Sequence, residues 1–158
     1  MQQVTLCLPV TNDGQVLLGL KRRGFGQGKV VGLGGKIEPG EDLRSAAVRE
    51  LYEESGLLAD PGRLELAARL TFHFPSYPAW NHRMHVFIVR AWRGEIAESD
   101  EITPQWHPLA ALPLGQMWDD GRLWLPRVLA GERLAMTCVY GPDLETVAAL
   151  AWEELAPS

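Results

Sequence analysis

The sequence of 158 residues lacks any long hydrophobic run and contains only two cysteines. No stretch approaches the roughly 18 continuous apolar residues of a membrane-spanning helix, so we expect no association with a membrane. The first residues lack the basic start and the small-residue cleavage site of a signal peptide. Cys7 and Cys138 are too few for a disulfide framework and too far apart for a metal knuckle. We therefore expect buried, reduced thiols and a cytoplasmic protein.

An excess of basic residues is also missing. The chain has 15 Lys and Arg against 20 Asp and Glu, a formal net charge of −5. Proteins that bind nucleic acid usually carry a basic footprint, so we expect no nucleic-acid partner. A phosphorylated small molecule stays compatible with an acidic site if divalent cations lie between the two sets of negative charge. The charge balance thus favours a small-molecule ligand. It does not distinguish a monomer from a dimer.

Internal repeats, linkers and low-complexity tracts are absent as well, which predicts a single domain over residues 1–158. Strand patterns mixed irregularly with two helical patterns predict a layered domain of the α/β or α+β class. The stretch 146–155 fits either a helix or a strand, since its alanines favour a helix and its short apolar run fits a strand. We predict strands at 4–10, 15–22, 65–74, 84–92 and 133–140, short strands near 30–33 and 105–107, and helices at 41–55 and 111–131.

The helix predicted at 41–55 gathers negative charge. Gly56 is well placed as its left-handed cap. Offsets of three and four put Glu50, Glu53 and Glu54 on nearly one face, where like charges repel. A solvated helix face is the usual reason for such a run. Because Gly35 precedes the helix and leaves a backbone carbonyl open, a Mg²⁺ site built from oxygen ligands is the alternative.

The same segment resembles the Nudix box, G-x5-E-x7-R-E-U-x-E-E-x-G-U, over residues 35–57. The resemblance implies an α/β/α sandwich around a mixed sheet, with the box as a loop–helix–loop. It implies hydrolysis of a nucleoside diphosphate linked to another group, with Mg²⁺ or Mn²⁺ held by the three glutamates and the Gly35 region. Glu41 and Arg49 are then structural residues of the box. Every fixed position is matched: Gly35, Glu41, Arg49, Glu50, Leu51, Glu53, Glu54, Gly56 and Leu57.

Nudix enzymes often use a further glutamate outside the box, from a loop that precedes a strand. The segment ESDEITPQW offers Glu98 and Glu101. The five-residue offset from Glu101 to Trp106 is similar to the family pattern, so the resemblance favours Glu101 as a further catalytic and metal-binding residue. An exposed loop acid is the alternative reading of the same position.

Blocks outside the box resemble the animal MutT-type hydrolases of oxidised purine nucleoside triphosphates. They are LLGLKRRGFGQGKVVGLGGK, MHVF, ESDE-x-x-P-x-W and MW-x-D-(x4)-P. This resemblance implies a diphosphatase that releases a nucleoside monophosphate and pyrophosphate. It nominates Lys21 for the phosphates. It nominates seven residues for the base pocket: Thr5, Val31, Phe72, Phe74, Met84, Trp118 and Asp120.

Two positions depart from that subfamily. Val31 stands where the subfamily carries Asn, and Gly121 stands where it carries a second aspartate. A site with fewer hydrogen bonds to the base discriminates less between related bases. The resemblance still implies a (d)NTP diphosphatase that favours oxidised purines such as 8-oxo-dGTP. The alternatives are another Nudix substrate, a dinucleoside polyphosphate or nucleotide sugar, and a noncatalytic nucleotide-sensing module.

Overall fold

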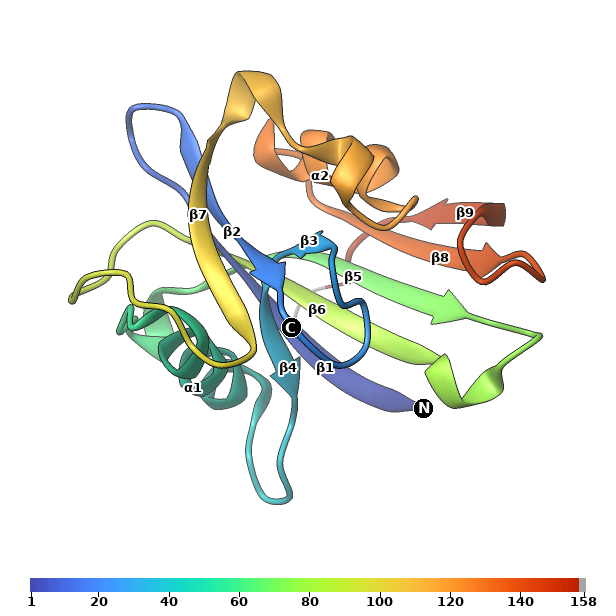
Figure 1. The fold of residues 1–158 in the computed structure, drawn as a ribbon, viewed down its shortest axis with the longest axis horizontal. Coiled ribbons are helices and arrows are strands. Elements are labelled where there is room, and N and C mark those ends of the chain that lie inside the picture. Colours follow the sequence, from blue (N-terminus) through green and yellow to red (C-terminus); the bar gives the residue numbers. More distant parts are fainter. Residues whose placement is uncertain (157–158) are drawn as a thin grey trace.

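The computed structural model describes residues 1–156, in which nine strands and two α-helices are found. Figure 1 shows the two helices on opposite sides of the strands. The strands are β1 (Gln2–Pro9), β2 (Gln15–Lys21), β3 (Val30–Val31), β4 (Leu33–Lys36), β5 (Glu65–His73), β6 (His82–Val89), β7 (Ile102–Pro108), β8 (Leu134–Tyr140) and β9 (Val147–Glu153). The helices are α1 (Leu43–Ser55) and α2 (Gly121–Leu129).

The strands form two sheets. A six-stranded mixed sheet has the order β4-β1-β6-β5-β8-β9, in which β1 runs parallel to β6 and β5 runs parallel to β8. A three-stranded antiparallel sheet has the order β3-β2-β7. The predicted mixed sheet is therefore confirmed.

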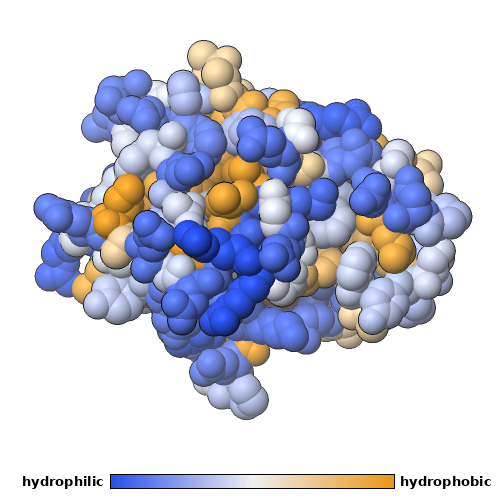
Figure 2. Space-filling view, viewed as in Figure 1, coloured by the Kyte–Doolittle hydropathy of each residue, from blue (hydrophilic) through white to orange (hydrophobic). Residues whose placement is uncertain are grey.

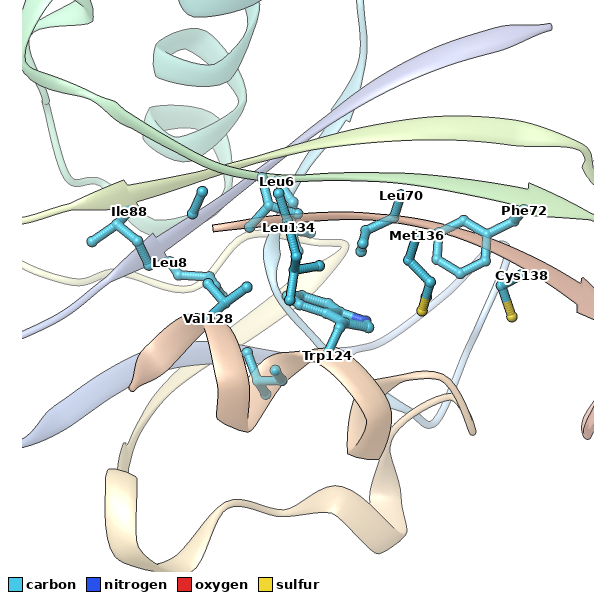
Figure 3. Packing of buried hydrophobic residues seen from close by; sticks show 14 of the residues in the cluster. Leu6, Leu8, Leu70, Phe72, Ile88, Trp124, Val128, Leu134, Met136 and Cys138 are labelled. Atoms are coloured by element: carbon cyan, nitrogen blue, oxygen red, sulfur yellow. The ribbon is translucent and has the colours of Figure 1, made fainter. Parts of the chain in front are cut away.

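Alternating side chains of the strands build a separate apolar cluster under each helix. Leu6 and Leu8 of β1 pack in the cluster that contains Trp124 of α2, as Figure 3 shows. Cys7 lies between them in sequence and packs in the cluster that contains Leu51 of α1. Because successive strand residues point to opposite faces, this alternation buries both faces of the sheet. The expected α/β/α layering is confirmed, and both cysteines are free and buried.

Helix α1 begins and ends where local sequence signals place it. Asp42 is its N-cap, and its carboxylate accepts a hydrogen bond of 2.8 Å from the backbone N–H of Ser45. Gly56 follows in the left-handed conformation, with φ 82°, and its N–H bonds to the carbonyl of Tyr52. The predicted helix at 41–55 and its glycine cap are confirmed to within two residues.

The second predicted helix, 111–131, is wrong in its first half. The α-helix begins only at Gly121, and short 3₁₀ turns occupy 109–111 and 114–116. Pro113 and Gly115 explain the difference, because each disfavours a continuous helix through the segment before Gly121. A turn closed by the N–H of Gly121 and the carbonyl of Trp118, 2.9 Å apart, leads into α2. The residues before α2 thus present Trp118 from a turn and not from a helix.

Other strands also differ from the prediction. The ambiguous stretch 146–155 contains strand β9, because pairing with β8 along its length outweighs the helix propensity of its alanines. The short strand near 105–107 is the middle of β7, which pairs with β2 from end to end. Its prolines suggest a break, but β7 is an edge strand, where a missing N–H is tolerated. The short strand near 30–33 is two strands, β3 and β4, in different sheets.

Hydrophobic surface is confined to small areas. Phe25, Leu150 and Trp152 are among the exposed large apolar side chains, and the last two lie on the edge strand β9. Figure 2 shows apolar residues near the middle of one face, bordered by hydrophilic ones. No helix in the part of the chain that the structure describes is long and apolar enough to cross a membrane.

The buried ring of His85 in β6 leads us to expect that the protein loses stability in acid. The ring is buried, and the Arg69 Nε–H donates to its Nδ1 while its Nε2 lies 2.8 Å from the Gln3 side-chain oxygen. Burial first, and then the charges of Arg69 and Arg83, lower the pKa of His85 from 6.5 to about 4. The unfolded chain therefore takes up the proton first. The contribution of neutral His85 to the free energy of unfolding is complete above pH 6.5. It is lost as the pH falls toward 4, and the loss is on the order of 2 kcal/mol.

Denaturant unfolding at pH 7 and pH 4.5 checks this expectation. His85→Gln should reduce the acid-induced loss of unfolding free energy, and His73→Gln, at a half-buried position, serves as the control. An unchanged acid dependence in His85→Gln would contradict the assignment.

Candidate active site

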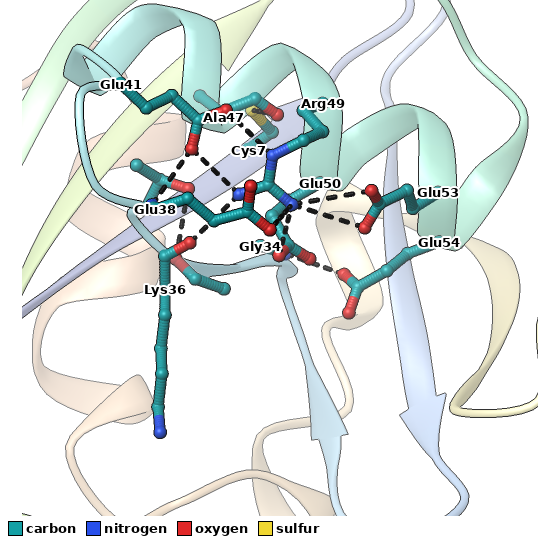
Figure 4. A network of polar contacts seen from close by, with 12 residues as sticks. Cys7, Gly34, Lys36, Glu38, Glu41, Ala47, Arg49, Glu50, Glu53 and Glu54 are labelled. Carbon is teal, nitrogen blue, oxygen red and sulfur yellow. Dashed lines mark hydrogen bonds and ion pairs between the residues drawn. The ribbon is translucent and has the colours of Figure 1, made fainter.

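Arg49 of α1 ties the acidic residues of the loop–helix–loop together (Figure 4). Its guanidinium donates two hydrogen bonds to the Glu41 carboxylate, of 2.8 and 2.9 Å. It also donates to Glu50 at 3.0 Å and to Glu53 at 3.3 Å, and it reaches the Lys36 carbonyl at 3.1 Å. These contacts lower the pKa of Glu41 to about 2, chiefly through the Arg49 hydrogen bond. Glu41 and Arg49 therefore fix the loop against the helix.

Glu54 is the buried member of the glutamate group, with 4% of its surface exposed. One carboxylate oxygen accepts a hydrogen bond of 2.8 Å from the backbone N–H of Gly34. Burial first, and then repulsion from Glu50, raise the pKa of Glu54 to about 8. The Gly34 N–H and the charge of Lys21 oppose that shift. A buried carboxylate beside other negative charges is costly, and a divalent cation would remove that cost.

The glycine at 35 fits such a site. A Cβ built on Gly35 would lie 2.6 Å from the Glu50 carboxylate carbon and 2.8 Å from both of its oxygens. No side chain larger than hydrogen can therefore share this space with Glu50. The Thr5 hydroxyl donates to the Gly35 carbonyl at 3.4 Å. Hard oxygen donors from carboxylates and a backbone carbonyl are the set that Mg²⁺ and Mn²⁺ prefer.

Two residues from the other sheet approach the glutamates. Lys21 ends β2, and its positive charge lowers the pKa of Glu54. Glu101 precedes β7, and its negative charge contributes to the raised pKa of both Glu50 and Glu54. Glu98 instead pairs with Arg22, at 3.2 Å. The charge of Glu101 acts on Glu50 and Glu54, whereas Glu98 is paired with Arg22, and this difference supports the choice of Glu101 over Glu98. The catalytic and metal-binding roles of Glu101 stay predictions.

The glutamates are not gathered around one point. Among residues 1–156, no three Asp, Glu, His or Cys side chains stand close enough to hold a metal ion. Arg49 draws Glu50 and Glu53 toward itself, and Glu54 turns to the Gly34 N–H, because each carboxylate takes the nearest positive or donor group. Small side-chain rotations would be needed to bring them together. The donor set still fits a hard divalent cation, and no geometry for one is defined.

Arg49→Lys is expected to lower kcat/KM by roughly 10- to 100-fold, the usual effect of losing a group that orients metal ligands. A lysine has one ammonium group and cannot hold Glu41 with two bonds while also reaching Glu50. Steady-state kinetics and a Mg²⁺ titration would measure the effect. Arg127→Lys, at an exposed ion pair on α2, is the matched control. A wild-type rate in Arg49→Lys would show that the orientation of these carboxylates does not limit activity.

Aromatic side chains from three segments form a second group, which packs with the α2-side cluster. Trp118 stacks on Phe25, with ring centroids 5.1 Å apart and an interplanar angle of 22°. Trp80 packs edge-on against both rings, at 4.5 Å from Phe25 and 6.2 Å from Trp118. The Lys29 ammonium lies 4.8 Å from the centre of a Trp118 ring. Flat rings with a cation nearby suit a purine that bears phosphates.

The predicted base-pocket residues fall into different environments. Phe72 and Phe74 are buried in the α2-side cluster, and Met84 packs against it. Val31 packs against the α1-side cluster instead. Thr5 is also buried, and its hydroxyl is engaged by Gly35. The structure therefore brings Phe72, Phe74, Met84 and Trp118 together and leaves Val31 outside their cluster.

Three aromatic neighbours of Trp118 escape sequence reasoning. Phe25 is the one aromatic residue of a glycine-rich loop, and that isolation is a signal that could have drawn attention to it. Trp80 ends the short 3₁₀ turn that precedes β6. Tyr140 lies at the end of β8 and meets Trp118 edge-on at 6.1 Å, and its distance along the chain gives no signal.

Comparison with known proteins agrees with this architecture. Residues 1–128 match the NUDIX domain, so the chain belongs to the Nudix hydrolase family. It is 45% identical over 130 residues to the oxidized purine nucleoside triphosphate hydrolase of Danio rerio, covering 82% of this chain and 81% of that protein. The Mus musculus protein of the same name is 40% identical over 124 residues, covering 78% of each. The crystal structure of a MutT protein from Bacillus halodurans superposes with a TM-score of 0.81 at 28% identity, covering 97% and 98% of the two chains.

Proposed function

We propose that this protein is a divalent-metal-dependent nucleoside triphosphate diphosphatase. It adds water across the bond between the α and β phosphates of a (d)NTP and releases (d)NMP and pyrophosphate. It favours oxidised purine nucleotides such as 8-oxo-dGTP and so removes damaged nucleotides from the pool. Residues 1–158 form a single domain, and the enzyme acts in the cytoplasm with no nucleic-acid or membrane partner.

The observation that carries the proposal is the buried Glu54 among like charges. Burial first, and then repulsion from Glu50, raise its pKa to about 8, and within residues 1–156 its carboxylate accepts one hydrogen bond, from the Gly34 N–H. Mg²⁺, or Mn²⁺ in its place, would supply charge neutralisation of phosphate oxygens and a lower pKa for the attacking water. The residues that would hold it are Glu50, Glu53, Glu54, Glu101 and the Gly35 carbonyl. This set consists of hard oxygen donors, which suit Mg²⁺ or Mn²⁺.

The remaining residues would bind and orient the substrate. Lys21 places positive charge next to Glu54, where a triphosphate would come closest to the glutamates. Phe25 stacks on one face of the Trp118 ring, and a purine would stack on the opposite face. A glutamate of the group takes the proton of the attacking water. The similarity to two animal hydrolases of oxidised purine nucleoside triphosphates supports the choice of substrate.

A panel of nucleotides tests the proposal. The purified protein is assayed with Mg²⁺ on dGTP, 8-oxo-dGTP, dATP and 8-oxo-dATP, and on a dinucleoside polyphosphate and a nucleotide sugar. We expect the highest kcat/KM for an oxidised purine triphosphate, with pyrophosphate as product. Preference for the dinucleoside polyphosphate or the nucleotide sugar would replace this function by another Nudix activity. If none of the six compounds is hydrolysed, the remaining interpretation is a noncatalytic nucleotide-sensing module.

A further inference from the structure

Glu101 lies in a tight turn just before β7. The Ser99 N–H donates to the Ile102 carbonyl at 3.0 Å, and the Ile102 N–H donates back to the Ser99 hydroxyl at 3.1 Å. Ile102 is buried and anchors the end of this turn in the core, whereas Glu101 is exposed. The place of the Glu101 side chain therefore depends on what holds the turn from outside.

Arg22, which follows β2, contacts this turn and its flanks at three points. Its backbone N–H donates to the Glu101 carbonyl at 2.7 Å. One guanidinium nitrogen, Nη1, donates to the Glu98 carboxylate at 3.2 Å and to the Thr103 hydroxyl at 2.8 Å. The end of β2 pairs with the start of β7, so the two segments lie side by side (Figure 1). Arg22 thus holds the chain before Glu101, at Glu101 and after it.

The neighbouring arginine is held differently. Arg23 pairs with Asp100 at 3.8 Å, and the two side chains are 63% and 92% exposed. An exposed ion pair at that distance contributes little to stability or to the place of a loop. Arg23 carries the same charge as Arg22 on the same segment, so it separates the effect of charge from the effect of the contacts that Arg22 makes.

We propose that Arg22 is a positioning residue that holds the turn before β7 and so sets the place of the Glu101 carboxylate opposite the glutamates of α1. This inference rests on the proposed function, in which Glu101 helps to hold the divalent cation. Burial first, and then nearby charges that include Glu101, raise the pKa of Glu50 and Glu54, so Glu101 acts on both in this arrangement.

A direct contact with a phosphate is the alternative role for an arginine that follows Lys21. Two features favour holding the turn instead. The Nη1 nitrogen of Arg22 already donates to two protein acceptors, and the positive charge is paired with the Glu98 carboxylate. The two roles differ in what they require of Thr103, because a phosphate contact needs only the charge of Arg22, and the positioning role also needs the hydroxyl that it holds.

Two variants test the proposal, each alone and combined with Glu101→Gln. Arg22→Met keeps an apolar stem and removes both side-chain contacts. Thr103→Val keeps the shape of the side chain and the charge of Arg22, and removes only the hydroxyl. Arg23→Met is the matched control. For each protein, kcat and KM are measured with Mg²⁺ on 8-oxo-dGTP, binding of Mn²⁺ without nucleotide is measured by electron paramagnetic resonance, and Tm is measured without metal.

Arg22→Met is expected to lower kcat and to weaken Mn²⁺ binding by roughly tenfold each, the usual effect of losing a group that orients a metal ligand. Thr103→Val should do the same by a smaller factor, roughly threefold, because one of the contacts is lost. In the Glu101→Gln background neither change should lower kcat further, since the carboxylate that they position is gone. Tm should stay within about 2 °C of wild type, because Arg22 is half exposed.

Three results would overturn the proposal. The first is a loss of rate in Arg22→Met that recurs by the same factor in the Glu101→Gln background, which marks an arginine that acts on the substrate directly. The second is an Arg22→Met protein with wild-type kcat and Mn²⁺ binding. The third is the same loss in Arg23→Met, which would mean that the charge of the segment matters and the contacts of Arg22 do not. If the wild-type protein hydrolyses no nucleotide, the proposed function fails, and Mn²⁺ binding by Arg22→Met and Glu101→Gln then decides alone whether Arg22 sets the place of this carboxylate.

Discussion

Replacing Glu54 by Gln is expected to lower kcat by on the order of a thousandfold while making the metal-free protein more stable. The loss of rate follows because a divalent cation contributes several kcal/mol of transition-state stabilisation, and an amide cannot replace a charged ligand. The gain in stability follows because the folded-state pKa of Glu54 is raised from 4.5 to about 8. At neutral pH Glu54 ionises without cost in the unfolded chain but not in the folded protein, so this side chain lowers the free energy of unfolding. Replacing it should therefore raise Tm by roughly 3 °C or more.

Steady-state kinetics with Mg²⁺ and thermal unfolding in metal-free buffer measure the two effects. Glu132→Gln, at an exposed ion pair with Arg127, is the control and should change neither. A wild-type kcat in Glu54→Gln would show that Glu54 does not belong to the active site. A Tm lowered by the change would show that the Gly34 bond stabilises the carboxylate more than burial destabilises it. Opposite signs for activity and stability are typical of residues kept for function.

Local signals predicted the loop–helix–loop well. Asp42 and Gly56 set the ends of α1 through their own backbone and side-chain geometry, and spacing alone put Glu50 and Glu54 on one face. A layered domain was predicted from strand patterns mixed with two helical patterns. The Nudix resemblance supplied the sandwich, which the superposition with the Bacillus halodurans MutT protein bears out.

Contacts distant in sequence account for the rest. Strand β9 is a strand because β8 lies beside it, and no propensity within 146–155 contains that information. The segment before α2 is a different case: it is apolar like a helix, but Pro113 and Gly115 break it into short turns, which is a local signal that the prediction passed over. Tyr140 reaches Asp120 from 20 residues away, so its hydrogen bond to a carboxylate that the resemblance assigns to the base pocket has no signal in the sequence.

The same limit applies to the charges of the site. The sequence shows three glutamates on a helix face, but it does not show that Arg49 holds two of them and a backbone N–H holds the third. Nor does it show which one is buried. Burial and partner decide the pKa of each carboxylate, and both depend on how α1 packs on β4 and on β1, a packing that the spacing of the glutamates does not specify.

The adjacent glycines 34 and 35 should separate stability from activity when each is changed to alanine. A Cβ on Gly34 would lie 1.8 Å from the backbone carbonyl oxygen of Thr5, which strand pairing between β1 and β4 holds in place. Backbone cannot yield as a side chain can, so Gly34→Ala should cost about 3 kcal/mol or more of unfolding free energy. For a chain of this size that is a fall in Tm of roughly 6 to 12 °C.

The three atoms nearest a Cβ on Gly35 all belong to the Glu50 carboxylate, the closest at 2.6 Å, and that side chain can rotate away. Gly35→Ala should therefore keep most of the wild-type Tm and lower kcat/KM by roughly 10- to 100-fold, because Glu50 is displaced from its place beside Gly35. Gly115→Ala, where a Cβ meets nothing within 4 Å, controls for the substitution itself. Equal losses of Tm in the two variants would mean that Gly35 serves the fold of β4, and an active Gly35→Ala protein would place the metal ligands elsewhere. Measured together by thermal unfolding and by the nucleotide assay, the pair distinguishes a glycine required by the sheet from one required by the chemistry.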